Sequence, residues 1–473
     1  MVFKNVLWRF GEKFGCQLVT FIISIIIAKI LEPSAYGVIA IVNACTQIFT
    51  VFIDVGFGAY IVRNKDSDEL DYSTAFTANV LLCLFLYFVI YCISPSIADF
   101  YHNQQLISLL RVSSVIILIS SVKNIQQAYI YRNSQFKLFF FSSLAGTISA
   151  GIVGIFMAIK GYGVWSLVIS NIFDTFIDTL VMMFTIKWKP KLKFSIEKFK
   201  KISSYSSRIM VSFLIDRAYK KLYQLSIGKM YSSDELAYYE KSKSFTEKIP
   251  ECSDSIIDTV IFPLMCNKSD NKTELVEISN KYLNLSTYIM FPLLIGMAII
   301  SESMIIVLLN EKWIDIIPYI RIMCFSELFI PFINVNNNIL KSLGRSDIVL
   351  KNEIIKKIIS IIILIIVISK GVQSIVVSLL LLNFVYFIID SSYTKQLVGY
   401  GALNQMMDIK NNIICVTLMG ILVLITTFAF TNVYLELFFG IIVGAISYVL
   451  FSIVLKNESF YYLIETIKGF FKK

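Results

Sequence analysis

Residues 205–265 read YSSRIMVSFLIDRAYKKLYQLSIGKMYSSDELAYYEKSKSFTEKIPECSDSIIDTVIFPLM, and whether this stretch crosses a membrane decides the topology of the chain. It carries many charges, whereas apolar windows long enough to span a bilayer lie on both sides of it. The windows are 14–31, 37–62, 75–97, 106–128, 138–159 and 164–186 before it, and 282–309, 316–340, 349–369, 372–397, 413–431 and 433–455 after it. About sixty structureless residues would be unusual in so compact a chain, which favours two further helices here.

The composition also indicates a membrane protein. Of the 473 residues, 56% are hydrophobic and only 16% are charged, and the mean hydropathy is +0.72. Soluble domains carry roughly 25% charge, so this chain is not an ordinary soluble enzyme. At about 34 residues per span and turn, the length allows roughly fourteen helices. We therefore predict an all-α polytopic membrane protein with about 14 transmembrane helices.

The order of the windows predicts two lobes of six helices followed by two further helices. We expect an N-terminal lobe over 1–186, a basic amphipathic linker over 187–204, a C-terminal lobe over 205–397, helices 13 and 14 over 398–455, and an amphipathic tail over 456–473. A weak repeat supports the two lobes, because residues 28–36 and 228–238 share a pattern of small residue, Lys and apolar residue that leads into a turn and Ala-Tyr.

Loop charges predict the orientation. With both charged helices crossing and the N-terminus inside, the inside segments hold 26 Lys and Arg and the outside loops hold four. Cytoplasmic loops of membrane proteins carry such an excess, so we expect both termini in the cytoplasm. The same bias explains the net charge of +10 without any nucleic-acid partner. If neither charged span crossed the membrane, every later loop would still lie on the same side as before. Loop charge alone therefore does not prove that the two spans cross.

The first charged span carries a stripe of polar residues. Within 205–230, these residues fall inside an arc of about 140°: Asp216, Arg217, Lys220, Lys221 and Gln224. Each charge facing lipid at the bilayer centre would cost roughly 2.5–3.5 kcal/mol. We therefore expect this stripe to face water or a charged partner, and we take Arg217, Lys220, Lys221 and Gln224 as candidate substrate-binding residues.

The next span carries an acidic stripe. Its polar face includes Glu240, Lys243, Ser244, Glu247, Glu251, Asp254 and Asp258, and the helix is interrupted at Pro250. Two interpretations stay open: the two stripes neutralise each other as ion pairs, or they line a polar cavity. We favour the cavity and take Asp216, Glu240, Glu247, Glu251 and Asp258 as candidate cavity or coupling acids.

Other charges within the windows look isolated, and we expect several of them to extend toward the membrane surface. They are Lys29, Asp54, Arg111, Lys123, Asp174, Asp178, Arg321, Glu327 and Asp390. Pro331, followed by Asn334 and three asparagines at 336–338, predicts a break in the tenth helix with unwound backbone.

No motif indicates a metal or another cofactor. The eight cysteines form no Cys-x-x-Cys pair, and His102 is the single histidine. We therefore expect no cofactor, no zinc site and no disulfide framework.

Several short motifs, taken in order, resemble the polysaccharide transporters of the multidrug/oligosaccharidyl-lipid/polysaccharide (MOP) exporter superfamily, the Wzx-like O-antigen and exopolysaccharide flippases. The motifs are LEPSAYG (31–37), DVGFGA (54–59) followed by Arg63, RNSQFK (132–137), KGYGVWSLV (160–168), FPL (262–264), EKW (311–313) and LGRSD (343–347). Their order and position relative to the windows carry the resemblance, which extends over about residues 1–350.

The resemblance implies a MOP/MATE-like fold with two lobes in alternating access, in the bacterial inner membrane. It implies a substrate that consists of an oligosaccharide on undecaprenyl pyrophosphate, with H+ or Na+ as a coupling ion and the polysaccharide polymerase machinery as a partner. The arginines in the first two helices of the peptidoglycan-precursor branch are absent here, where Lys29 is the one deep basic residue. That departure leaves the cation site to Arg217, Lys220 and Lys221.

Two other functions compete with that of a flippase. A MATE-like exporter of small cations would suit a cavity dominated by carboxylates, and the basic seventh span argues against it. A polymerase or a lipid-dependent glycosyltransferase needs catalytic groups in sizeable external loops. The predicted outside loops are too short for this and lack paired carboxylates, so we expect the chain not to be an enzyme.

Overall fold

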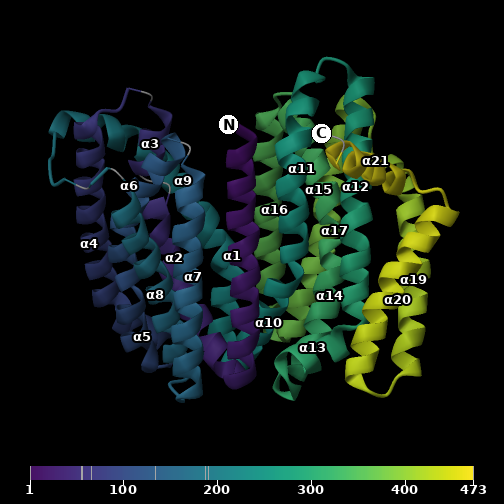
Figure 1. Cartoon of the computed structure of the whole chain (residues 1–473), viewed down its shortest axis with the longest axis horizontal. Helices are drawn as coiled ribbons and strands as arrows, with labels where there is room; N and C mark the ends of the chain where they lie inside the picture. The colour runs from purple at the N-terminus through teal and green to yellow at the C-terminus, as the bar shows by residue number, and fades with distance from the viewer. Residues whose placement is uncertain are drawn as a thin grey trace. The chain divides into compact units, whose positions relative to one another are not determined.

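The computed structural model describes residues 2–54, 57–64, 66–133, 135–186, 188–189 and 191–471. Over these residues the regular structure is helical and includes no strand, which confirms the predicted all-α class (Figure 1). By internal packing the chain forms two compact units, Met1–Ala237 and Tyr238–Lys473.

The first unit contains long helices joined by short turns. They are α1 (Val2–Ile30), α2 (Pro33–Asp54), α3 (Phe57–Arg63), α4 (Glu69–Phe100), α5 (Gln105–Ser113), α6 (Val115–Arg132), α7 (Phe136–Ile159), α8 (Val164–Thr185) and α9 (Ile196–Met230). The next helix, α10 (Ser233–Thr246), begins in the first unit and continues into the second.

The second unit continues with α11 (Lys248–Asn267), α12 (Lys272–Ile299), α13 (Ser301–Leu309), the 3-10 helix η1 (Glu311–Ile316), α14 (Ile317–Glu327), α15 (Ile330–Ser342), α16 (Ser346–Val367), η2 (Ile368–Lys370), α17 (Val372–Val398), α18 (Ala402–Asp408), α19 (Lys410–Ala429), α20 (Val433–Val454) and α21 (Glu458–Phe471). Helices α19 and α20 pack side by side as a hairpin (Figure 1).

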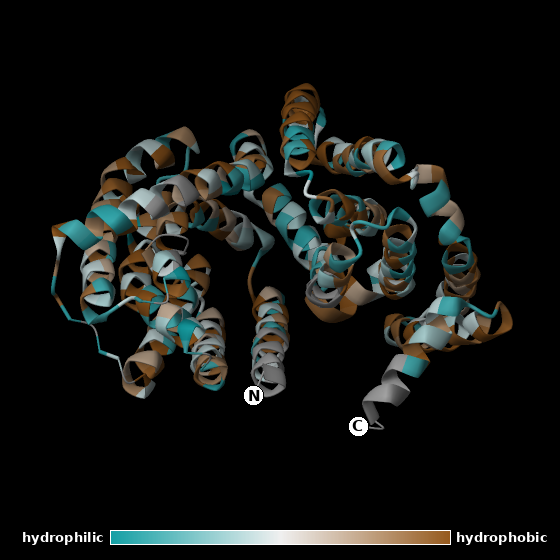
Figure 2. Ribbon diagram, turned by 90° about the horizontal axis from the view of Figure 1, so that it is seen from above, coloured by the Kyte–Doolittle hydropathy of each residue, from teal (hydrophilic) through white to brown (hydrophobic). Residues whose placement is uncertain are grey.

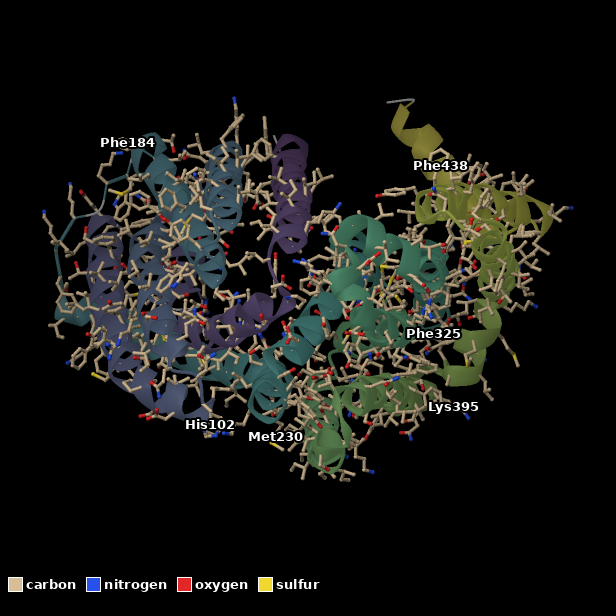
Figure 3. The ribbon with its side chains drawn as sticks, turned by 90° about the horizontal axis from the view of Figure 1, so that it is seen from below. His102, Phe184, Met230, Phe325, Lys395 and Phe438 are labelled. Carbon is tan, nitrogen blue, oxygen red and sulfur yellow. The ribbon has the colours of Figure 1, made fainter. Side chains whose placement is uncertain are left out.

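Most of these helices have the length and composition of membrane spans. Among the described residues, ten helical segments are long and apolar enough to cross a bilayer. Adding α1, α9, the α10–α11 pair and α16 gives fourteen long helices in that part of the chain, which agrees with the predicted number. Hydrophobic residues occur along the helices of both units and are mixed with more polar ones (Figure 2). Large apolar side chains such as Phe184 and Phe438 are exposed (Figure 3), as expected of a multi-pass membrane protein.

Two predicted helix breaks are present, each beside a proline. Helix α14 ends at Glu327 and α15 begins at Ile330, with Pro331 in its first turn. Helix α10 ends at Thr246 and α11 begins two residues later, which places Pro250 in the first turn of α11. Proline lacks a backbone N–H, and the first turn of a helix tolerates this loss.

The asparagines after Pro331 differ from the prediction, because they are helical and not unwound. Asn336 is buried and exchanges two hydrogen bonds with Gln405, at 3.1 and 2.8 Å, and its Oδ1 also accepts from Thr394 Oγ1 at 2.6 Å. This network joins α15, α17 and α18. A buried amide whose groups are bonded costs little in a helix, so Asn336 binds neighbouring helices and leaves the backbone of α15 intact.

The two turns that carry the weak repeat lie against each other in the first unit. A Cβ atom built on Gly37 would lie 1.8 Å from the Ser233 carbonyl oxygen. The start of α2 and the start of α10 therefore meet backbone to backbone, and only glycine fits at position 37.

Helix α9 begins inside the stretch predicted as a linker. Ser195 caps it by accepting from the Lys198 amide at 3.5 Å, and Ile202 is buried with Phe57 and Tyr72 in one hydrophobic cluster. The Lys198 ammonium donates to Asp68 at 2.6 Å and lowers the pKa of that carboxyl to about 2. The first turns of α9 are thus fixed to the start of α4.

The prediction that the remaining charges are isolated is wrong for four of them in the described structure, and one of the four is Arg321 of α14, which lies 3.8 Å from Glu302 of α13. Lys123 of α6 pairs with Asp178 of α8 at 2.6 Å. Asp390 of α17 pairs with Lys356 of α16 at 2.5 Å, with both residues less than 5% exposed, and its other carboxylate oxygen accepts from Asn352 at 3.1 Å. The partners lie on different helices, so inspection of each window by itself misses the pairing.

Removing one member of the Lys356–Asp390 pair should destabilise the protein. Lys356→Ala leaves a buried, uncompensated carboxylate, a type of change that costs about 3–5 kcal/mol. We expect a lower midpoint of thermal unfolding in detergent for Lys356→Ala and Asp390→Ala, and a partial recovery in the double variant. Lys351→Ala, at an exposed position of the same helix, is the control. Equal midpoints for Lys356→Ala and this control would contradict the assignment.

Gly37→Ala should also be destabilising, because the new methyl group would collide with the Ser233 carbonyl. Overpacking typically costs about 1–3 kcal/mol, and here backbone must move. Gly296→Ala is the matched control, since no atom lies within 4 Å of the added Cβ. We expect membrane abundance and the unfolding midpoint to fall for Gly37→Ala alone. If the two variants behave alike, the close approach does not exist in the membrane.

Candidate functional site

The C-terminal third of α9 is held firmly against α2. Tyr223, Gln224 and Ile227 are buried, and the Gln224 side-chain amide donates to the Ala40 carbonyl at 2.8 Å. The backbone carbonyl of α2 that receives this bond is already in a helix, so the contact ties the two helices together at a defined height.

The middle of α9 has a different environment. Val211, Phe213 and Ile215 are exposed, and so is Lys220, whose side chain is 67% exposed. Lys220 pairs with Asp216 one turn earlier at 2.9 Å, and Arg217 is half-buried. This middle segment therefore presents two cations and one carboxylate between two parts of the helix that are fixed to other helices.

The four residues predicted to bind substrate fall into two groups in the structure. Gln224 and Lys221 are bonded to each other, since the Lys221 ammonium donates to Gln224 Oε1 at 3.0 Å, and Gln224 also holds α2. Arg217 and Lys220 lie in the exposed middle segment. Their side chains can reach an anion without breaking the α2–α9 contact, so we regard these two as the stronger candidates.

Of the five predicted acids, Asp216 lies on α9, and the other four lie on α10, on α11 or at the break between them. Two of these four pair with lysines of the same polar stretch. Glu247, at the break between the helices, is 3.5 Å from Lys243, and Glu251 pairs with Lys248 at 2.8 Å. Glu240 is half-buried, and the side chain of Asp258 lies outside the described residues. Arg217 belongs to the first unit and these four acids belong to the second. The cations and the acids are therefore described as two separate groups.

One cation of this region was missed by the sequence analysis. Lys241 of α10 is only 6% exposed, and its ammonium lies 5.8 Å from the ring centre of Phe245 and 5.9 Å from that of Trp313. Aromatic rings attract cations through their faces. The signal was Lys241 beside the aromatic pair 238–239, on the side of α10 away from the acidic stripe.

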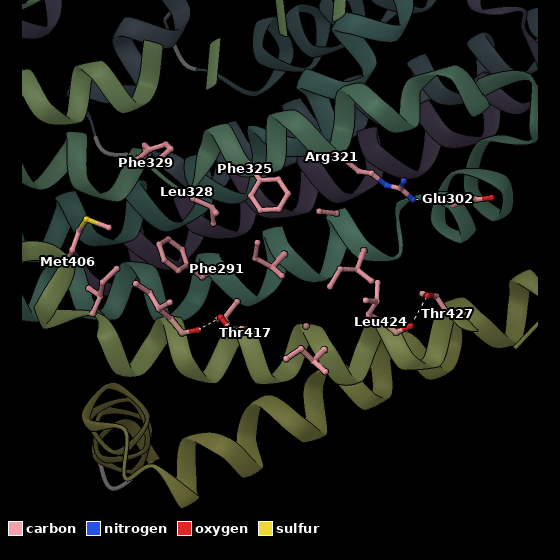
Figure 4. Close-up of a pocket in the computed structure, with 18 of the residues that line it drawn as sticks. Phe291, Glu302, Arg321, Phe325, Leu328, Phe329, Met406, Thr417, Leu424 and Thr427 are labelled. Atoms are coloured by element: carbon pink, nitrogen blue, oxygen red, sulfur yellow. Dashed lines mark hydrogen bonds and ion pairs between the residues drawn. The ribbon is translucent and has the colours of Figure 1, made fainter. Parts of the chain in front are cut away.

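The second unit contains a cavity of about 930 Å³. Its walls come from α12, α14, α19 and neighbouring segments, and its lining is mostly aliphatic and aromatic, with Phe291, Phe325 and Phe329 among the residues (Figure 4). A volume near the upper end of the usual 300–1,000 Å³ range fits a sizeable apolar ligand.

Metal chemistry finds no support in the described residues, where no group of three or more His, Cys, Asp or Glu side chains is placed to hold an ion. The first unit contributes the cations of α9, and the second unit contributes carboxylates and an apolar cavity.

Comparisons with known proteins agree with this picture. TuaB, a teichuronic acid biosynthesis protein of Bacillus subtilis, is 26% identical over 316 residues, which span 64% of this chain and 63% of TuaB. ExoT, a succinoglycan biosynthesis transport protein of Rhizobium meliloti, is 19% identical, with 70% of this chain and 69% of ExoT covered.

Among solved structures, the lipid II flippase MurJ in an inward closed conformation aligns with a TM-score of 0.77. The alignment covers 96% of this chain and 99% of that chain at 14% identity. Identity this low shows a shared fold, which confirms the expected MOP-like architecture.

A family model described as "Polysaccharide biosynthesis protein" matches residues 26–318. This match covers more than half of the chain, including most of the first predicted lobe, the whole charged stretch and α12. The chain belongs to the polysaccharide biosynthesis protein family.

Proposed function

We propose that this protein is a flippase that moves undecaprenyl-pyrophosphate-linked oligosaccharide repeat units from the cytoplasmic to the outer leaflet of the bacterial inner membrane, for O-antigen, capsule or exopolysaccharide synthesis. Family membership supports the polysaccharide part of the proposal. The names of ExoT, a transport protein, and MurJ, a flippase, support the transport part.

The observation that carries the proposal is the exposed, cationic middle of α9. A diphosphate has at least two negative charges and many acceptor oxygens, and charge-assisted hydrogen bonds to Arg or Lys are the strong way to hold it. Arg217 offers a planar fork of donors, and Lys220 lies one turn along the same side of the helix. An apolar helix face would offer nothing to such a headgroup.

Release needs a competitor for the same cations. Asp216 already pairs with Lys220 at 2.9 Å, so a substrate phosphate must displace a carboxylate and can in turn be displaced by it. In an alternating-access cycle, Glu240, Glu247, Glu251 and Asp258 supply further carboxylates for this exchange or for a coupling proton or Na+. The polymerase machinery would receive the translocated repeat unit.

The competing function is a MATE-like, cation-coupled exporter of small molecules. It would use the carboxylates of α10 and α11 as the binding groups and would have no need for Arg217 and Lys220. The two proposals therefore differ in whether the cations or the carboxylates bind the transported molecule, and mutation of the α9 cations separates them.

The proposed orientation can be tested with single cysteines. We expect residues 103, 234 and 311 to react with an impermeant thiol reagent from the periplasmic side, and residues 195, 270 and 346 to react only after the membrane is opened, because basic loops stay inside. The measurement is labelling in a background without the native cysteines. Labelling of position 234 from the cytoplasmic side would remove the charged helices from the membrane and overturn the site.

The proposed site can be tested in a deletion strain, which should lose the surface polysaccharide and accumulate lipid-linked repeat units inside. We expect Arg217→Ala and Lys220→Ala each to reduce complementation about tenfold or more, since a hydrogen bond to a charged group contributes about 1.5–3 kcal/mol. Arg217→Lys should be milder, because it keeps the charge.

Lys201→Ala is the matched control, because Lys201 forms the same type of one-turn ion pair with Glu197 on α9, at 3.2 Å, outside the middle segment. Membrane abundance of every variant is measured by immunoblot. Full complementation by the Arg217→Ala/Lys220→Ala double variant would refute the cation site. Normal polysaccharide with increased drug sensitivity in the deletion strain would favour the exporter.

A further inference from the structure

A smaller pocket of the second unit lies between α12 and the tail helix α21, which pack against each other (Figure 1). Its volume is about 330 Å³, near the lower end of the usual range of ligand pockets. Amides, carboxylates and phenol rings dominate its walls, which consist of Asn280, Lys281, Asn284 and Leu285 from α12 and Glu458, Ser459, Tyr461, Tyr462 and Glu465 from α21. These residues of α12 follow the loop that contains residue 270, which the proposed orientation places in the cytoplasm.

A buried chain of hydrogen bonds fixes the two walls of this α12–α21 pocket relative to each other. Asn457 Nδ2 donates to Asn412 Oδ1 at 2.7 Å, and Asn412 Nδ2 donates to the Asn284 backbone carbonyl at 2.9 Å. The Ser459 amide, in the first turn of α21, donates to Asn457 Oδ1 at 3.0 Å. Asn412 and Asn457 are each only 1% exposed. The pocket is therefore preformed, which lowers the cost of ordering its walls around a ligand.

Two asparagines one turn apart leave a hydrogen-bond donor and an acceptor for a ligand. The Asn284 side-chain nitrogen donates to the Asn280 side-chain oxygen at 2.8 Å and to the Asn280 backbone carbonyl at 3.1 Å. Within the described structure, the Asn280 side-chain nitrogen and the Asn284 side-chain oxygen have no hydrogen-bond partner. The nitrogen can only donate and the oxygen can only accept. A ligand that bonds to both must therefore contain an acceptor and a donor.

The α21 wall adds two aromatic rings and two carboxylates. Tyr461 and Tyr462 are 44% and 52% exposed, so the protein leaves part of each ring uncovered. Glu458 and Glu465, when ionised, only accept hydrogen bonds. Lys281, which contributes an ammonium from the α12 wall, is already paired with Glu277 at 2.7 Å. The lining therefore has a net negative charge and aromatic surface beside its amides.

We propose that this pocket is a carbohydrate site that takes one or two sugar rings of the repeat unit at the cytoplasmic end of the second unit. Each sugar hydroxyl can both donate and accept, so one hydroxyl accepts from Asn280 while a neighbouring hydroxyl donates to Asn284. The apolar C–H face of the ring packs on Tyr461 or Tyr462 and is removed from water. This inference rests on the proposed function for its sugar-bearing substrate and adds a second point of contact with that substrate.

Hydrogen-bonding capacity argues against small charged ligands. A phosphate diester contains acceptors only, so it would leave the Asn284 oxygen without a donor and would add negative charge beside Glu458 and Glu465. An alkyl ammonium contains donors only, so it would leave the Asn280 nitrogen without an acceptor. A neutral ring with several hydroxyl groups satisfies both asparagines and adds no charge.

The test is ligand binding to the purified, full-length protein in detergent, measured by saturation-transfer NMR. The probe is the oligosaccharide repeat unit released, without its diphosphate, from the surface polysaccharide of the strain that encodes this protein. Dimethyl phosphate and propylamine are compared with it at equal concentrations. We expect saturation transfer to the C–H protons of the repeat unit and weaker binding of both charged compounds.

Variants of each wall test the assignment. Asn280→Leu/Asn284→Leu removes the donor and the acceptor at similar side-chain size, and we expect about tenfold weaker binding of the repeat unit. Tyr461→Ala should also weaken binding, whereas Tyr461→Phe should keep most of it, because the ring is retained. The matched controls are Asn411→Leu on α19 and Tyr434→Ala, which is 69% exposed on α20, and both positions lie outside the lining. Unfolding midpoints show whether each variant is folded.

Three results would overturn the carbohydrate site. They are no saturation transfer to the repeat unit, tighter binding of dimethyl phosphate or propylamine than of the repeat unit, and equal binding by the asparagine double variant and Asn411→Leu.

The failure of this site and the failure of the proposed flippase are distinguishable. Arg217→Ala/Lys220→Ala changes the first unit only, so it should bind the released repeat unit as the unchanged protein does. Lost complementation by that variant, together with no sugar binding by the unchanged protein, would refute the pocket alone. Full complementation by it, together with normal sugar binding, would refute the cation site and support the pocket.

Discussion

The hydrocarbon interior of a membrane offers no hydrogen bonds, and the described structure depends on how each polar group at that depth finds a partner inside the protein. The Lys356–Asp390 pair, at 2.5 Å with Asn352 as a third member, is the strongest example. Each ion by itself would be costly in that setting. Together they join α16 to α17, much as Asn336 and Gln405 join α15 to α18. Polar residues in these helices thus determine which helices pack against each other. Uniform apolar packing specifies these neighbours poorly.

The sequence was sufficient for the helices but not for their pairing. Hydropathy windows predict where helices lie because backbone bonding in a membrane leaves few alternatives, and Pro250 and Pro331 predict the two breaks because proline restricts position within a helix. Partners across helices are another matter. Lys356 and Asp390 are 34 residues apart, and no local pattern marks them as neighbours. Hydropathy alone does not single out Lys356 as a membrane-embedded cation, so the sequence offers no partner for Asp390.

The candidate site shows the same division. The helical arc of α9 could be calculated from sequence, and it places Arg217, Lys220 and Gln224 on one side of the helix. It could not show that Gln224 bonds to the Ala40 carbonyl, 184 residues away, while Lys220 stays exposed. The arc gives the direction of each side chain around one helix. Whether a side chain can bind a ligand also depends on whether a neighbouring helix covers it. The cavity of the second unit was equally beyond reach, because its walls come from residues between 291 and 436 that share no motif.

The constraint on polar groups also explains why the charged stretch is the informative part of the chain. Helices α9, α10 and α11 fall outside the set of apolar spans, yet they are as regular as the others. A helix bundle needs no such charges to fold, since apolar helices would insert more favourably. Arg217 and Lys220 lie between two firmly packed parts of α9, where Arg217 is half-buried and Lys220 is exposed and pairs with Asp216. We propose that a charged substrate accounts for the cations at this position.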